Sequence, residues 1–145
     1  MTAGRICTRE TDLVDADESV QVAAERMHAR NVGTLIVLDQ ESHPIGMITD
    51  RDLALRIVAK GRDPIQTLVG EIMTRFPYNV NEETPIEMAL SKMRAGGFRR
   101  LPVVDADGKL VGVLSLDDIL ELLCSEFTEI GNLIRKESPS SLAHP

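Results

Sequence analysis

The chain has 145 residues, of which 43% are hydrophobic and only 3% aromatic, and its formal net charge is −7. This length suits one ordinary domain, or two small repeats that share an aliphatic core. The acidic balance argues against a nucleic-acid-binding protein and against binding to an anionic membrane surface.

The cysteines and the apolar runs exclude further classes. Cys7 and Cys124 have no spacing that predicts a disulfide framework or a metal site. The first ten residues lack the apolar core of a signal peptide, and no apolar run approaches the about 20 residues that span a bilayer. We therefore expect a cytoplasmic protein with no membrane partner.

The sequence contains an internal repeat, because a shift of 66 residues aligns 6–53 with 72–119 without a gap. The identities include turn residues as well as apolar positions, which is difficult to obtain by chance. In the first unit the identical residues are Ile6, Thr8, Arg9, Val14, Ala23, Met27, Ala29, Leu35, Val37, Asp39, Gly46 and Asp52.

Each unit is expected to begin with a short extended segment, around Val14 or Val80, followed by a helix. Apolar residues at helical spacing predict these helices over 19–30 and 85–95. Thr84 is expected to cap the second helix, with Pro85 at its first helical position.

Two apolar runs around a polar turn come next in each unit and predict a hairpin. Thr49 or Ser115 then opens a second helix with acidic residues in its first turn, where the helix dipole favours them. The apolar stripe after Ser115 predicts that the last helix continues to about Lys136. Each unit is therefore β-α-β-β-α, in the α/β (α+β) class. The expected boundaries are 5–62 and 73–124 for the repeats, 63–72 for a linker, and 125–145 for a helical extension with a frayed tail.

The strand-to-helix junctions GMITDRDL (46–53) and GVLSLDDI (112–119) share the pattern G-h-h-[ST]-x-x-D-h, in which h is apolar. Together with the repeated unit, RLPVVD and Met73-Thr74, this pattern resembles the CBS domain, and the pair resembles a Bateman module. The resemblance covers about residues 5–123 and suggests a stand-alone CBS-pair protein. It implies repeats packed with pseudo-twofold symmetry, clefts for adenosine-containing ligands, and a homodimer.

The junctions themselves have a chemical interpretation. A strand that turns into a helix at Thr49 or Ser115 presents backbone N–H groups that favour phosphate. Asp52 or Asp118 follows one helical turn later, and an ionised carboxylate can accept two hydrogen bonds from a ribose. The alternative is that each [ST]-x-x-D sequence is only a capping box, and both interpretations can hold together.

The resemblance also implies which residues complete each cleft. The first cleft would contain Thr49, Arg51, Asp52, Thr74, Pro77, Tyr78, Phe98, Arg99 and Arg100. The second cleft would contain Thr8, Thr11, Asp12, Val32, Gly33, Thr34, Ser115 and Asp118.

The first cleft is expected to bind more strongly, because its three arginines suit phosphate oxygens and Tyr78 could lie flat against adenine. We expect it to take a phosphorylated adenine nucleotide. AMP is the first choice, and ADP, ATP, NAD and S-adenosylmethionine are alternatives. A solvated basic corner at 99–100 and simple packing of Tyr78 are the competing interpretations.

The second cleft has no basic residue at the matching position, and it carries Asp12 and Asp117. It is expected to bind more weakly, or to select an uncharged adenosyl end.

A catalytic role is not expected. Asp50 and Asp52 diverge on a helix, and His28, His43 and His144 have no Cys or Asp partner at metal or nucleophile spacing. The leading hypothesis is a regulatory module that senses an adenine nucleotide and signals to an unknown effector protein. The alternative is a constitutive dimeric adaptor with vestigial clefts, whose C-terminal amphipathic helix docks a partner.

Overall fold

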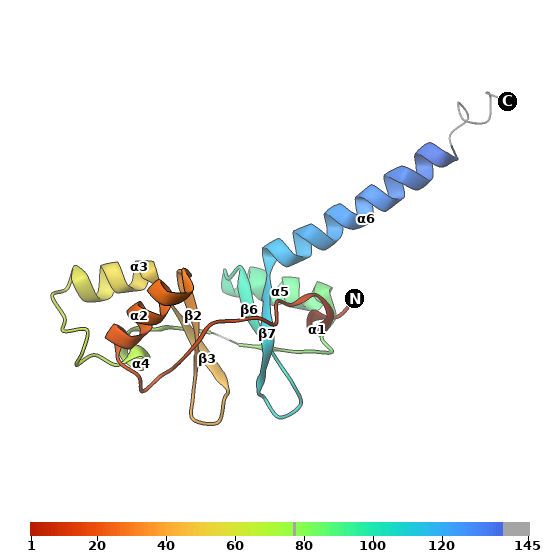
Figure 1. Ribbon diagram of the computed structural model, residues 1–145. Helices are drawn as coiled ribbons and strands as arrows, with labels where there is room; N and C mark the ends of the chain where they lie inside the picture. Colours follow the sequence, from red (N-terminus) through yellow and green to blue (C-terminus); the bar gives the residue numbers. More distant parts are fainter. Residues whose placement is uncertain (77, 138–145) are drawn as a thin grey trace.

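The computed structural model describes residues 1–76 and 78–137, which form two α+β halves lying side by side (Figure 1). The first half contains β1 (Leu13–Asp15), α2 (Val20–Arg30), β2 (Thr34–Leu38), β3 (Pro44–Thr49), α3 (Asp50–Leu53) and the π-helix η1 (Ala54–Val58). The second contains β5 (Val80–Asn81), α5 (Ile86–Gly96), β6 (Arg100–Val104), β7 (Leu110–Ser115) and α6 (Leu116–Lys136). Three short elements complete the fold, namely α1 (Ala3–Ile6), α4 (Val69–Ile72) and β4 (Thr74–Arg75). The predicted α+β class and the predicted end of the last helix are confirmed.

The helix ends follow the local sequence. Asn31 and Gly97 adopt left-handed conformations, with φ of 54° and 70°, and end α2 and α5. The Ser19 hydroxyl caps α2 by accepting a hydrogen bond from the first turn. The expected position of Pro85 is wrong by one residue. Its ψ of 146° is extended, so Pro85 is the N-cap and the helix begins at the next residue.

The two sheets are built alike. In the first, the strand order is β1-β2-β3-β4, with β1 parallel to β2 and the other pairs antiparallel. In the second, the order is β5-β6-β7, and Thr8 forms a bridge with Val113 where the first sheet has β4. Each sheet packs against its own aliphatic core, and Leu35 and Leu101 are fully buried at equivalent positions of these cores.

Each half is completed by a segment that precedes the other repeat. The Ala3 N–H donates to the carbonyl of Thr84 at 2.8 Å, so α1 packs on the second half. At the equivalent position, the Val69 N–H donates to the carbonyl of Glu18 at 2.9 Å, and α4 packs on the first half. The chain therefore crosses between the halves twice, and the crossings bring residues of one repeat to the junction of the other.

Glycine is required where the crossing segments meet the sheets. A Cβ atom at Gly46 would lie 2.6 Å from the carbonyl oxygen of Thr74. A Cβ atom at Gly112 would lie 2.5 Å from that of Thr8. This close approach is the physical reason why both junction motifs begin with glycine.

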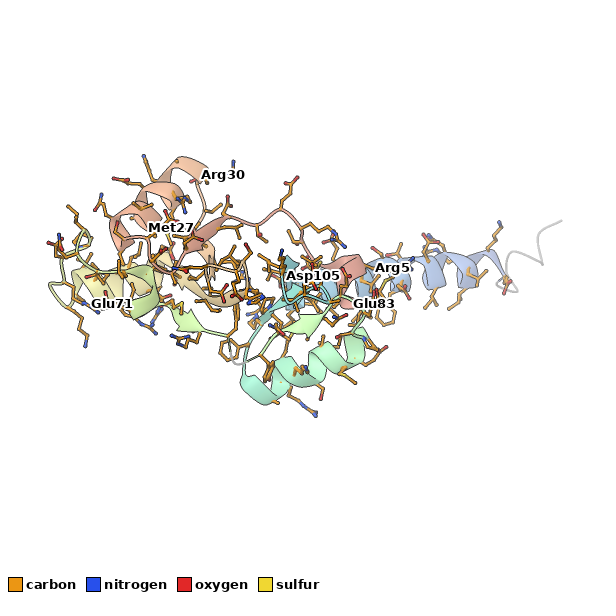
Figure 2. The ribbon with its side chains drawn as sticks, turned by 90° about the horizontal axis from the view of Figure 1, so that it is seen from below. Arg5, Met27, Arg30, Glu71, Glu83 and Asp105 are labelled. Carbon is orange, nitrogen blue, oxygen red and sulfur yellow. The ribbon has the colours of Figure 1, made fainter. Side chains whose placement is uncertain are left out.

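The two halves meet through a small apolar cluster in which Ile36 and Leu38 of β2 contact Val113 of β7. Seen from below, α2 and α5 lie at opposite sides of the body, and α6 runs away from both halves (Figure 2). The contact between the halves thus lies along β2 and β7, next to the two junctions.

Candidate functional site

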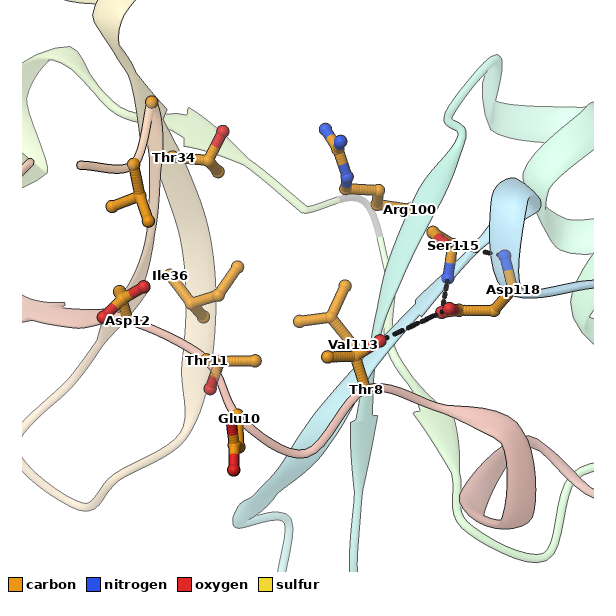
Figure 3. Close-up of a pocket in the computed structure, with 12 residues that line it drawn as sticks. Thr8, Glu10, Thr11, Asp12, Thr34, Ile36, Arg100, Val113, Ser115 and Asp118 are labelled. Atoms are coloured by element: carbon orange, nitrogen blue, oxygen red, sulfur yellow. Dashed lines mark hydrogen bonds between the residues drawn. The ribbon is translucent and has the colours of Figure 1, made fainter. Parts of the chain in front are cut away.

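A pocket of about 440 Å³ opens between the two halves (Figure 3). Its lining includes all eight residues expected in the second cleft: Thr8, Thr11, Asp12, Val32, Gly33, Thr34, Ser115 and Asp118. Glu10, Ile36, Arg100 and Val113 complete the lining. The structure therefore gathers residues from four separate stretches of the chain around one concave site.

One wall is the start of α6, where Ser115 and Asp118 form a reciprocal capping box. The Asp118 N–H donates to Oγ of Ser115 at 3.0 Å, and the Ser115 N–H donates to Oδ2 of Asp118 at 3.0 Å. The hydroxyl of Thr8 donates to Oδ1 of Asp118 at 3.3 Å. The capping interpretation is thus confirmed. The Asp118 carboxylate also lines the pocket, and its hydrogen bond from the Thr8 hydroxyl is longer than those of the capping box.

The opposite wall comes from the first half, where Val32, Gly33 and Thr34 lead into β2. Figure 3 shows Thr34 and Ile36 on this side of the pocket. Asp12 lies beside them, and its Oδ1 accepts a hydrogen bond from Nε of Arg30 at 2.7 Å. This bond with the Asp12 carboxylate raises the pKa of Arg30. One acidic group of the pocket is therefore already neutralised by a neighbouring guanidinium.

Arg100 is the basic residue of this pocket, and Figure 3 shows it between Thr34 and Ser115. We expected Arg100 in the first cleft, whereas it lines this pocket. The positions that match Arg99 and Arg100 in the first repeat are Gly33 and Thr34, which are not basic, so the basic group of this pocket comes from the second repeat. A neighbouring pocket of about 240 Å³ is lined by Arg99, Arg100, Ser115, Leu116 and Asp117. The two pockets share Arg100 and Ser115, so the arginine pair lies next to the start of α6.

Arg99 and Asp117 form an exposed ion pair with an N–O distance of 3.7 Å. Both side chains are 75% exposed, so the pair is weak in water and can open to an incoming anion.

The Cys7 thiol lies near Asp118. Burial raises the pKa of this thiol, the positive charge of Arg9 opposes the rise, and the Asp118 carboxylate adds to it. Cys7 is therefore held as the neutral thiol at neutral pH.

The Thr49–Asp52 junction forms the same capping box, with hydrogen bonds of 3.1 and 3.0 Å. Its surroundings differ. Oδ1 of Asp52 lies 3.8 Å from Nε of Arg56, and Arg56 also donates to the carbonyl of Ile72 at 2.6 Å. A residue of the protein itself thus supplies a cation to Asp52. Arg51, the next residue expected here, is exposed.

The aromatic residues expected in the first cleft pack against the second half. The Tyr78 hydroxyl donates to the carbonyl of Lys92, and the Lys92 ammonium lies 5.6 Å from the ring centroid. The ring is half-buried against the second core. Phe98 is also half-buried and lies beside Gly96. Packing, the competing interpretation, therefore describes Tyr78.

The remaining residues expected in the first cleft are also placed. Thr74 pairs with Met47 in the sheet, and Pro77 lies outside the described residues.

Ile36 and Val113 were missed, although the sequence holds a signal for them. Each lies two residues from a predicted site residue on the same strand, Thr34 or Ser115, and alternate residues of a strand share a face. Glu10 lies in the irregular segment between Thr8 and Thr11, where no period marks it.

A comparison with protein-family models matches the CBS domain to residues 3–59 and again to 69–125. The chain belongs to the CBS domain family. Two CBS domains stand in tandem, and the two matches begin at α1 and α4, the segments that cross between the halves.

Curated relatives of this CBS pair come from distant organisms. An uncharacterized protein of Methanopyrus kandleri is 30% identical over 122 residues, which are 84% of this chain and 62% of that protein. The CBS domain-containing protein YhcV of Bacillus subtilis is 39% identical over 112 residues, 77% of this chain and 78% of that protein. The chain thus spans less than two thirds of the first of these relatives.

Solved structures share the architecture. Hypoxic Response Protein I, with two coordinated zinc ions, has a TM-score of 0.72 at 30% identity, covering 83% of this chain and 98% of that one. A CBS domain protein of Pyrobaculum aerophilum complexed with AMP has a TM-score of 0.68 at 26% identity, covering 86% and 99%. A CBS domain pair in complex with 5′-methylthioadenosine and S-adenosyl-L-methionine has a TM-score of 0.68 at 25% identity, covering 85% and 99%.

Within residues 1–76 and 78–137, no three His, Cys, Asp or Glu side chains are grouped so that they could hold a metal ion. Among the helices of the described part of the chain, none is both long and apolar enough to cross a membrane.

Proposed function

We propose that this CBS pair is a regulatory module that binds an adenosine-containing ligand in the pocket between its halves. The observation that carries the proposal is the meeting of the Ser115–Asp118 junction with residues 32–34 of the other repeat around one pocket. Its volume of about 440 Å³ lies within the range of about 300–1,000 Å³ usual for small-molecule sites.

The chemistry of the walls suggests how such a ligand lies. The Asp118 carboxylate accepts hydrogen bonds from the ribose hydroxyls. These bonds replace the 3.3 Å hydrogen bond that Asp118 accepts from the Thr8 hydroxyl. Ile36 and Val113 offer apolar surface to the adenine. A phosphate points toward Arg100 and the start of α6, where guanidinium and backbone N–H groups favour an anion.

The balance of charges favours a ligand with few phosphates. Glu10 and Asp118 line the pocket together with the guanidinium of Arg100, and the third carboxylate, that of Asp12, is paired with Arg30. We therefore favour AMP over ADP, ATP and NAD, and we place S-adenosylmethionine second because its sulfonium is a cation. The relatives complexed with AMP, and with 5′-methylthioadenosine and S-adenosyl-L-methionine, support this ligand class.

A ligand in this pocket touches both halves and so acts on their relative packing. If the halves can pack in two ways, the ligand shifts the free-energy difference between these two arrangements. This shift cannot exceed the difference between the ligand's binding free energies for the two arrangements. In this account the signal passes to an effector protein through the packing of the halves or of a homodimer.

Thermal unfolding with millimolar AMP, ADP, ATP, NAD, S-adenosylmethionine and GTP tests the proposal, because a ligand that binds the native state raises its stability. We expect AMP to raise Tm and GTP to leave it unchanged. Asp118→Asn should abolish the shift, whereas the matched variant Asp52→Asn should keep it. Absence of a shift with every ligand, in protein that releases no nucleotide on denaturation, would overturn the proposal.

The adaptor function remains the second candidate, favoured by the exposed apolar side chains along α6. It predicts that Asp118→Asn leaves every protein–protein interaction of the chain unchanged. The sensor predicts that this variant loses the response to the ligand.

A further inference from the structure

Helix α6 continues far beyond the body of the protein, as Figure 1 shows. Ile119 is buried and Leu122 is half-buried in the second half. Beyond Leu122, every residue of the helix except Gly131 is exposed, and Gly131 is half-buried. The exposed apolar residues are Leu120, Leu123, Phe127, Ile130, Leu133 and Ile134.

These residues follow the heptad spacing of a coiled coil. Leu120, Leu123, Phe127, Ile130 and Ile134 are separated alternately by three and four residues, which places them along one seam of the helix. We call these five residues the α6 seam. The other side of the helix is polar, with Ser125, Thr128, Glu129 and Asn132. A seam of this kind is the pattern with which one helix packs against another.

The extension is also poorly suited to stand alone. Isolated helices of about 12–15 residues are marginal in water, and most helices of proteins gain their stability from packing. Thr128 and Gly131 lower the intrinsic helix propensity further. A surface that covers the seam would therefore stabilise the helix itself as well as bury apolar area.

We propose that the α6 seam packs against α6 of a second copy of this chain, in antiparallel orientation. The charges of the helix decide between the orientations. Asp117, Glu121 and Glu126 make its first part acidic, whereas Arg135 and Lys136 make its end basic. In the antiparallel register given below, Glu121 lies opposite Lys136 of the second copy and the helix dipoles oppose each other, whereas a parallel pair would bring the acidic first parts of the two helices together.

The heptad spacing fixes the layers of the pair. Phe127 packs against Ile130 of the second copy, and Leu123 against its Ile134. In this register the end of the second helix lies opposite Leu120, the first exposed residue of the seam, so the partner helix stays clear of the folded body. The contact is small compared with the about 800 Å² per partner of a standard interface, so we expect a micromolar dimer.

Two other partners for the α6 seam can be distinguished from a second copy of the chain. An anionic lipid surface is disfavoured by the acidic first part of α6. A helix of an unrelated protein would leave the isolated chain monomeric at every concentration. The proposal does not depend on the ligand pocket.

Sedimentation velocity of the full chain from low to high micromolar concentration tests the contact. We expect a reversible monomer–dimer equilibrium. Phe127→Glu, which puts a charge in the centre of the seam, should raise the dimer Kd at least about 30-fold. Ser125→Glu adds the same charge on the polar side and should leave Kd unchanged. A monomer throughout, or a dimer that Phe127→Glu does not weaken, would overturn the proposal.

Disulfide formation tests the orientation in a Cys124→Ser background. Leu123→Cys together with Ile134→Cys should give covalent dimers under oxidation, whereas either change alone should give no more than the background, in which Cys7 remains. Covalent dimers from each single cysteine would show a parallel pair and overturn the antiparallel arrangement.

Discussion

The two strand-to-helix junctions of this protein have the same local hydrogen bonds and different surroundings. Thr49–Asp52 and Ser115–Asp118 each form a reciprocal capping box with distances of 3.0–3.1 Å. Arg56 lies next to the first aspartate, whereas Thr8 and a pocket lie next to the second. A four-residue motif determines how a helix starts, and segments distant in sequence determine whether that start becomes a binding site.

The exchange of segments between the halves explains this difference. Because α1 packs on the second half and α4 on the first, the residues that follow them, Thr8 and Thr74, reach opposite junctions. The halves should therefore depend on each other for stability.

The largest expected effect concerns the dependence of each half on the other for its stability. Leu35→Ala and Leu101→Ala remove equivalent, fully buried side chains from the two cores, and each should cost about 2–5 kcal/mol of unfolding free energy. Urea unfolding followed by far-UV circular dichroism should show a single transition for both variants. Two separated transitions in either variant would mean that the halves fold independently.

A smaller effect is expected where the crossing segments meet the sheets. Gly46→Ala and Gly112→Ala place a Cβ within 2.6 Å of a backbone oxygen, and each should destabilise by about 1–3 kcal/mol. Gly112→Ala should also weaken ligand binding, because it displaces the segment that carries Thr8. The control is Gly131→Ala, which meets only the end of the Arg135 side chain and should stabilise α6 by up to about 1 kcal/mol. Equal stability of Gly112→Ala and the unmodified chain would contradict this account of the crossing.

The smallest effect distinguishes the starts of α2 and α5. The hydrogen bond from Arg26 to Glu18, 2.9 Å long, lowers the pKa of Glu18 below its ordinary value of 4.5, and α5 has no such pair because Thr84 occupies the equivalent position. A lowered pKa in the folded state stabilises the protein above the unfolded pKa, and this contribution is lost as pH falls through the folded value.

Glu18→Gln should therefore cost about 0.5–1 kcal/mol at pH 7. The difference from the unmodified chain should shrink as the pH falls below about 4.5 in urea titrations. A difference that stays constant with pH would assign the effect to lost packing.

Much of this fold could be predicted from the sequence, since the 66-residue repeat, the helix ends at Asn31 and Gly97, and the last helix are local signals. The eight residues of the Asp118 pocket were also predicted together, because the family resemblance carries their arrangement. The presence of Arg100 in the lining of this pocket was not predicted, because it depends on how β6 faces β2 across the contact between the halves. The bond of Arg56 to the carbonyl of Ile72 likewise depends on tertiary packing with α4, which periodicity does not encode. The contact of Arg56 with Asp52 was missed although the two residues are four apart, the spacing of neighbours on a helix face.

The most direct test of the central claim is isothermal titration of AMP into the unmodified chain, Asp52→Asn and Asp118→Asn. Both substitutions keep the shape of the side chain and remove its charge, so they change the two capping boxes alike. The account predicts one principal site per chain, weakened at least about tenfold by Asp118→Asn and unchanged by Asp52→Asn. A site that Asp52→Asn removes and Asp118→Asn leaves intact would contradict it.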